Sequence, residues 1–223
     1  GWDNVLEVEQ ARGAIEPLLL GSSPAIAEVA LVYSDRAKAF LTTEPLKGMN
    51  YRGLLTDCYA RLLAMGIHRD VIPESAPLHG RKLLLTPFLP YVSDEFIAKA
   101  MTFAEQGGIW IVGPFTGCRT EEHTIPTDTA LGKLEQLSGI EAVSSYPFDG
   151  TGASGQAFGM TAPLGMWGTV FEPHGAASVG IVEGGLTPGR SFLTEHRVGR
   201  GWLVMLGVMP MGEEGDAMLR AML

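Results

Sequence analysis

The stretch RKLLLTPFLPYVSDEFIAKAMTFAEQGGIWIVG, residues 81–113, carries the clearest fold signal in this chain. Its first part, RKLLLTPFL at 81–89, is a continuous apolar run that predicts a buried strand. Ser93 then provides the N-cap of a helix, and a glycine pair at 107–108 ends that helix. The run IWIVG at 109–113 predicts the next strand. Continuous apolar strands joined by a helix are typical of a parallel sheet covered on both faces.

The residues before this stretch repeat the alternation of helix and strand. AEVALVYS at 27–34 predicts a buried strand after a Ser-Ser-Pro break, and the apolar residues of 4–21 recur at helical spacing. Residues 49–67 predict a further helix, which Gly66 ends. Its apolar face consists of Leu54, Leu55, Cys58, Leu62 and Met65. The whole pattern predicts a doubly wound α/β core over residues 25–145.

After residue 140 the chain changes to short β-like runs with many glycines. SFLTEHRV and WLVMLGV, joined at 199–201, predict a β-hairpin, and residues 213–222 predict a terminal helix. We expect the β-like runs of 146–210 to extend the same sheet or to fold against it. Because no linker separates them from the core, residues 1–223 are predicted to form one domain.

Composition argues against several classes of function. The chain has 223 residues, 46% of them hydrophobic, which is enough for a substantial core. Its formal net charge of −9, without any run of lysine or arginine, argues against nucleic acid as a partner. The apolar runs are too short to span a bilayer and no signal pattern is present, so no membrane partner is predicted. Two cysteines do not make a disulfide framework, and we expect a cytoplasmic protein.

Cys118, in the loop GPFTGCRTEEH, is the candidate nucleophile. A catalytic thiol in a doubly wound fold usually sits on a tight strand-to-helix turn, with an imidazole nearby to take its proton. Cys118 instead comes five residues after Gly113, and polar loop follows it. The pattern therefore favours an unreactive loop cysteine, with Cys118 and His123 kept as an alternative catalytic pair. Glu121 and Glu122 are expected to be solvated.

Other motifs predict neither a cofactor nor a metal. GTGASG at 150–155 has the spacing of a dinucleotide-binding loop, but Gly159 and Pro163 would break the helix that such a loop requires, so a turn is predicted. The five histidines show no paired spacing that would bring two imidazoles to one metal ion.

The order of these elements resembles the middle, trimerisation domain of family 42 glycoside hydrolases, the β-galactosidases. The most specific segments are LLLTPFLPYVSDEF at 83–96, IVGPFTG at 111–117 and LEQLSGI at 134–140. The resemblance covers about residues 5–145, and TEHRVGRGWLVMLG at 194–207 resembles the closing hairpin of that domain.

This resemblance implies a flavodoxin-like fold, related to the class I glutamine amidotransferase domain, that follows a catalytic (β/α)8 barrel and forms subunit contacts in a homotrimer. The residue at the place of Cys118 would not be catalytic. The family's two catalytic glutamates belong to the barrel, and its acid/base glutamate follows an asparagine. Here the two asparagines precede Val5 and Tyr51, so that pair is absent. We therefore predict a non-catalytic oligomerisation and scaffold domain of a longer hydrolase.

Two alternatives remain open from the sequence. One is an amidotransferase-like hydrolase that uses Cys118. The other is a carbohydrate-binding module, since sugars stack on exposed indoles; Trp110 and Trp202 lie in core-like patterns, which leaves Trp167 as the candidate sugar contact. Any ligand crevice is expected at the carboxyl ends of the strands, lined by residues 114–125.

Overall fold

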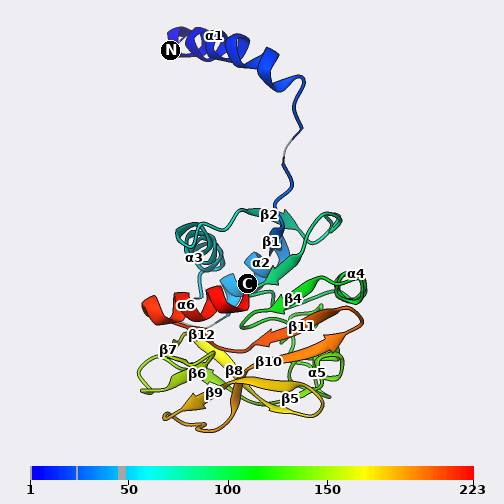
Figure 1. Ribbon diagram of the computed structural model, residues 1–223, viewed down its shortest axis with the longest axis vertical. Helices are drawn as coiled ribbons and strands as arrows, with labels where there is room; N and C mark the ends of the chain where they lie inside the picture. The colour runs from blue at the N-terminus through cyan, green and yellow to red at the C-terminus, as the bar shows by residue number, and fades with distance from the viewer. Residues whose placement is uncertain (1, 24, 45–48) are drawn as a thin grey trace.

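The computed structural model describes residues 2–23, 25–44 and 49–223 of the chain. These residues include one twelve-stranded sheet, which Figure 1 shows with helices around its upper part and glycine-rich strands at its lower end. The upper part is parallel and the lower part antiparallel. The prediction of an α/β fold with a parallel core and a β-rich extension is confirmed.

Five strands form the parallel part of the sheet. In spatial order they are β2 (Arg69–Pro73), β1 (Val29–Tyr33), β3 (Leu83–Thr86), β4 (Ile109–Val112) and β11 (Gly201–Leu206). Val29 pairs with both Arg69 and Leu83, and Ile109 pairs with both Leu83 and Trp202. The carboxyl ends of all five strands therefore meet at one edge of the sheet.

The sequence pattern missed strand β2. It is the outermost strand of the parallel part, and only Ile72 among its five residues is buried. An edge strand that faces solvent carries no continuous apolar run, so its pattern resembles a loop.

Helices cover both faces of the parallel part. They are α2 (Asp35–Thr43), α3 (Tyr51–Ala64), α4 (Asp94–Glu105), α5 (Lys133–Ser138) and α6 (Gly212–Met222). Helices α3 and α6 line an apolar cavity together with Ile111 of β4, whereas Phe96 of α4 packs edge-on against Trp110, 6.1 Å between ring centroids. Because neighbouring residues of a strand point to opposite faces, α4 lies opposite α3 and α6.

The predicted helix signals are confirmed. The Ser93 hydroxyl accepts a hydrogen bond from the backbone N–H of Phe96 at 3.2 Å, which caps α4. Gly66 follows α3 in the left-handed region with φ of 73°, where glycine carries no steric penalty.

The remaining strands form the antiparallel extension. They are β5 (Ile140–Pro147), β6 (Ser154–Ala157), β7 (Met160–Gly165), β8 (Trp167–Pro173), β9 (Ala177–Glu183), β10 (Ser191–Val198) and β12 (Met209–Pro210). The predicted hairpin is β10 with β11, and β11 also pairs in parallel with β4. This hairpin therefore joins the extension to the core as one continuous sheet.

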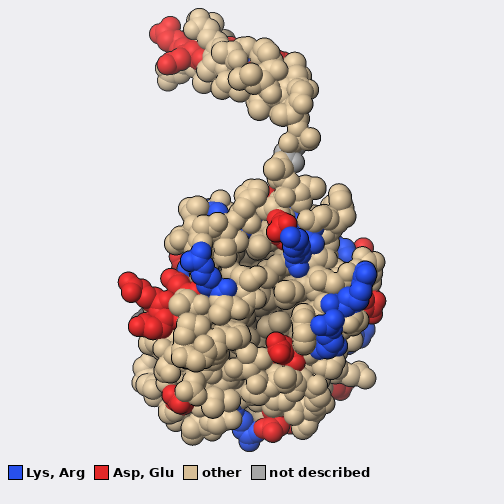
Figure 2. Space-filling view, in the orientation of Figure 1, with Lys and Arg blue, Asp and Glu red and all other residues tan. Residues whose placement is uncertain are grey.

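The N-terminal helix α1 (Trp2–Leu19) confirms the predicted helix but contributes nothing to the core. None of its residues is buried, and both Figure 1 and Figure 2 show it apart from the rest of the molecule. Its exposed apolar residues include Trp2, Val5, Leu6, Val8, Ile15, Leu18 and Leu19. Among the described residues, no helix combines the length and apolar character needed to cross a membrane.

Candidate functional site

The loop after β4, which contains Cys118, is held in place by buried hydrogen bonds. The Thr116 hydroxyl donates to the carbonyl oxygen of Thr86 at 2.8 Å and accepts from the N–H of Leu89 at 3.2 Å. The indole N–H of Trp110 donates to the Thr86 hydroxyl at 3.0 Å. These bonds tie the loop to the carboxyl ends of β3 and β4, so it is a fixed part of the fold.

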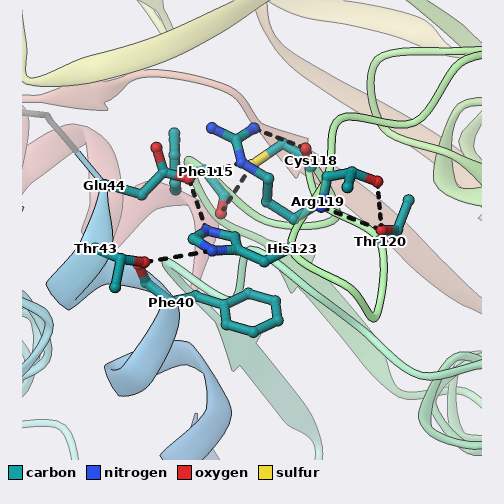
Figure 3. A network of polar contacts seen from close by, with 9 residues as sticks. Phe40, Thr43, Glu44, Phe115, Cys118, Arg119, Thr120 and His123 are labelled. Carbon is teal, nitrogen blue, oxygen red and sulfur yellow. Dashed lines mark hydrogen bonds and ion pairs between the residues drawn. The ribbon is translucent and has the colours of Figure 1, made fainter.

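The second half of this loop contacts the end of α2 through a compact ionic network, shown in Figure 3. The Arg119 Nε donates to Glu44 Oε1 at 2.6 Å, and His123 Nε2 lies 3.0 Å from the same oxygen. The His123 ring stacks on Phe40 with 4.1 Å between centroids, and its Nδ1 lies 3.3 Å from the Thr43 hydroxyl. Both imidazole nitrogens are therefore occupied by α2 and its C-cap.

The network stabilises the carboxylate of Glu44. Its side chain is only 7% exposed, and that of Arg119 is 16% exposed. Burial alone would raise the pKa of Glu44, but the hydrogen bonds and charges of Arg119 and His123 outweigh it and lower this pKa. Glu44 is thus an ionised partner for the loop, with a structural role.

The structure does not form the alternative catalytic pair. The Cys118 thiol contacts the carbonyl oxygen of Phe115 at 3.7 Å, and no hydrogen bond joins it to His123 among the described residues. Burial raises the pKa of Cys118 to about 12. A thiol nucleophile needs the opposite shift, because the thiolate is the reactive form. Of the neighbouring carboxylates, Glu121 pairs with Arg36 at 3.0 Å, and both Glu121 and Glu122 are exposed.

We expect Cys118 to react slowly with an aromatic disulfide reagent at neutral pH. Burial raises its pKa and that of Cys58 to about 12, so the thiolate fraction of each is about a thousandfold below that of a thiol with a pKa near 9. The measurement is the absorbance of the aromatic thiolate that the reagent releases. The denatured chain is the control, because both of its cysteines should react at once. Fast labelling of Cys118 alone, lost in Cys118→Ala, would contradict a structural role.

The other candidates lie away from this loop. Trp167 is partly buried at the start of β8, Trp110 is fully buried, and Trp202 is half-buried with the Arg197 guanidinium 4.8 Å from its ring centroid. The stretch 150–155 begins as a turn, and its last two residues, Ser154 and Gly155, already belong to strand β6, so it lacks the helix of a dinucleotide site. Within the described ranges, no three His, Cys, Asp or Glu side chains are grouped as a metal would require.

The carboxyl edge of the sheet carries a cavity of about 300 Å³, lined mainly by residues that follow β1, β2 and β3. Its polar lining includes Arg36, Glu74, Tyr91, Glu95, Lys99 and Glu121. Of the loop expected to line a crevice, only Glu121 does so, because the Glu44 network holds the rest of that loop against α2. Sequence reasoning missed this lining, since no local motif connects residues from separate loops.

Comparison with known proteins gives the family. A family model described as the β-galactosidase trimerisation domain matches residues 27–223. This chain belongs to that family. The match includes the core, the extension and the last helix, and α1 lies outside it.

Two curated relatives match this chain over its whole length. β-Galactosidase YesZ of Bacillus subtilis is 55% identical over 222 residues, covering 100% of this chain and 34% of the relative. β-Galactosidase YesZ of Bacillus licheniformis is 54% identical over 223 residues, with the same coverage. The chain therefore spans about a third of the length of these relatives.

Solved structures share the fold of the trimerisation domain. Gan42B, a GH42 β-galactosidase of G. stearothermophilus, superposes with a TM-score of 0.83 at 22% identity, over 99% of this chain and 33% of that chain. The β-galactosidase of Halorubrum lacusprofundi superposes with a TM-score of 0.82 at 23% identity, over 90% of this chain and 30% of that chain. The fold thus occurs as one part of larger enzymes.

Proposed function

We propose that this domain joins three copies of a longer β-galactosidase-like chain and leaves the sugar chemistry to a catalytic barrel outside residues 1–223. The observation that carries the proposal is the family match over 27–223, in a chain that covers only 34% of a relative 55% identical to it. The raised pKa of the partly buried Cys118 thiol and the occupied nitrogens of His123 favour this scaffold role over a hydrolase. The cytoplasmic location stays a prediction.

Helix α1 supports a contact with another part of the longer chain. It lies before the family match, yet the Bacillus relatives match it as part of the same alignment. Trp2 is 83% exposed and Leu18 is 77% exposed, on a helix with apolar residues on several sides. Exposed apolar surface of this kind usually marks an interaction site, and we infer that the preceding barrel covers it.

We also propose a flavodoxin-like fold and a single domain for this chain. The spatial order β2-β1-β3-β4, continued by β11, supports a flavodoxin-like core, in which β11 takes the place of the fifth parallel strand. The continuous sheet supports a single domain for the core of 25–145, the extension of 146–210 and the terminal helix of 213–222.

We expect light scattering of the purified chain to give three times its mass of 23.8 kDa, because a closed trimer satisfies the contact surfaces of every copy. The companion measurement is an immunoblot of the source cells with an antibody against this chain. The mass of the native band is expected to exceed that of this chain by at least the mass of a barrel of about 250 residues. A longer native chain that remains monomeric would contradict the scaffold role, and a 23.8 kDa native band would contradict the attached barrel.

A further inference from the structure

The cavity at the carboxyl edge has the position of a ligand site. It lies between the segments that follow β1 and β3, the two strands from which the connections leave in opposite directions, with Glu74 contributed from directly after β2. Open α/β sheets bind ligands at this point, because the loops on either side diverge and leave a crevice. The proposed trimerisation role does not by itself account for this cavity.

Several polar side chains of the cavity lining can form further hydrogen bonds. Among the described residues, the carboxylates of Glu74 and Glu95 and the hydroxyl of Tyr91 have no hydrogen-bond or ion-pair partner. The Lys99 ammonium donates to the carbonyl oxygens of Glu74 and Ala76, which places its charge beside the cavity. Burial raises the pKa of Tyr91, so its hydroxyl remains a donor at neutral pH.

The distribution of charge selects against ions. The carboxylates of Glu74, Glu95 and Glu121 lie beside the cations Arg36 and Lys99, and Arg36 is paired with Glu121 at 3.0 Å, so neither an anion nor a metal ion meets charges of a single sign. A neutral ligand whose groups both donate and accept hydrogen bonds satisfies both kinds of side chain. Hydroxyl groups have this property.

We propose that this cavity binds a small neutral saccharide, with its hydroxyl groups bound by Glu74, Glu95 and Lys99 and its apolar face against the Tyr91 ring. The Arg36 guanidinium lies over that ring, 4.9 Å from its centroid, and both side chains line the cavity. A volume of about 300 Å³ is at the lower end for ligand sites and suits one or two sugar units. The choice of galactosides as probes rests on the proposed function.

The test is saturation-transfer NMR on the whole 223-residue chain with galactose and lactose. We expect saturation transfer to at least one sugar, and Tyr91→Ala to weaken its binding about tenfold or more. The matched control is Tyr59→Ala, because Tyr59 is also a partly exposed tyrosine with an arginine, Arg69, 3.9 Å from its ring centroid, but it lies outside the cavity. This control should bind sugar as the unchanged chain does.

A second variant keeps the test decisive if Tyr91→Ala does not fold. Glu95 is exposed in the first turn of α4, so Glu95→Ala should keep the fold, checked by circular dichroism, and weaken sugar binding several-fold. The inference is overturned by absence of transfer to both sugars, by equal binding in the cavity variants, or by binding of inorganic phosphate or calcium in place of sugar. Light scattering of the same samples separates the two proposals, because a monomer that binds sugar through Tyr91 contradicts only the trimer.

Discussion

Replacement of Gly201 by alanine is expected to destabilise the domain by about 3 kcal/mol, at the upper end for overpacking a core. Gly201 begins β11, where the hairpin lies directly on the end of α4. An added Cβ would lie 2.9 Å from the carbonyl carbon of Gly107, and closer still to the carbonyl oxygens of Ala104 and Gly108. These are backbone atoms, so a side-chain rotation cannot relieve the clash.

The neighbouring hydrogen bonds explain why the hairpin cannot simply move away. The Arg200 N–H donates to the carbonyl oxygen of Glu105 at 3.1 Å, and the Trp202 N–H donates to that of Gly108 at 3.1 Å. Shifting Gly201 outward would break these bonds and the parallel pairing of β11 with β4. The loss of these hydrogen bonds would therefore weaken the contact between the core and the extension.

Urea unfolding followed by circular dichroism measures this effect. The control is Gly53→Ala in α3, where the nearest atom to an added Cβ is Asn50 Cγ at 3.8 Å. Alanine within a helix is more stable than glycine by about 0.5–1 kcal/mol, so this variant should be slightly stabilised. Equal midpoints for the two variants would show that the hairpin adapts, contrary to the packing described.

Replacement of Glu44 by alanine is expected to destabilise the domain by about 3 kcal/mol, because it leaves the largely buried Arg119 guanidinium without its anion. Arg119 is 16% exposed, so water replaces the lost carboxylate only in part. Glu44→Gln keeps a hydrogen-bond acceptor and should lose less. The exposed pair of Glu28 and Lys82, 62% and 74% exposed, gives the control, and Glu28→Ala should cost less than about 1 kcal/mol.

The same network predicts a dependence on pH. Since the pKa of Glu44 is lowered in the folded state, its contribution is fully present above the ordinary glutamate value of 4.5. It is lost as the pH falls through the lowered pKa. The difference in unfolding free energy between the unchanged chain and Glu44→Gln should therefore shrink on acidification. A difference that is constant from neutral to acidic pH would mean that Glu44 is not held as an anion.

The elements predicted from the sequence are those specified by neighbouring residues. The apolar run at 81–89 became β3, Ser93 caps α4, and the hairpin of β10 and β11 turns where its glycines lie. Each depends on contacts within a few positions along the chain, such as hydrogen bonding to the next helical turn. The unsuitability of 150–155 as a dinucleotide loop was equally local, because the residues that follow could not form a helix.

The candidate sites required the tertiary structure. Glu44 and Arg119 are 75 positions apart, and Tyr91 meets Arg36 only because β1 and β3 are neighbours in the sheet. The sequence placed Cys118 in a loop, but only the packed loop shows its burial and the engagement of His123 by α2.

The sequence alone was enough to predict most of the core strands, the capped helices, the closing hairpin and, through its resemblance, the family, because periodicity, capping and motifs are short-range properties; it was not enough for the edge strand β2. The folded chain alone decided that β11 inserts beside β4, that α1 stays outside the core, and which charges surround the cavity. The physical reason is that long-range contacts depend on how the chain returns on itself, and no local pattern encodes which distant side chain it meets.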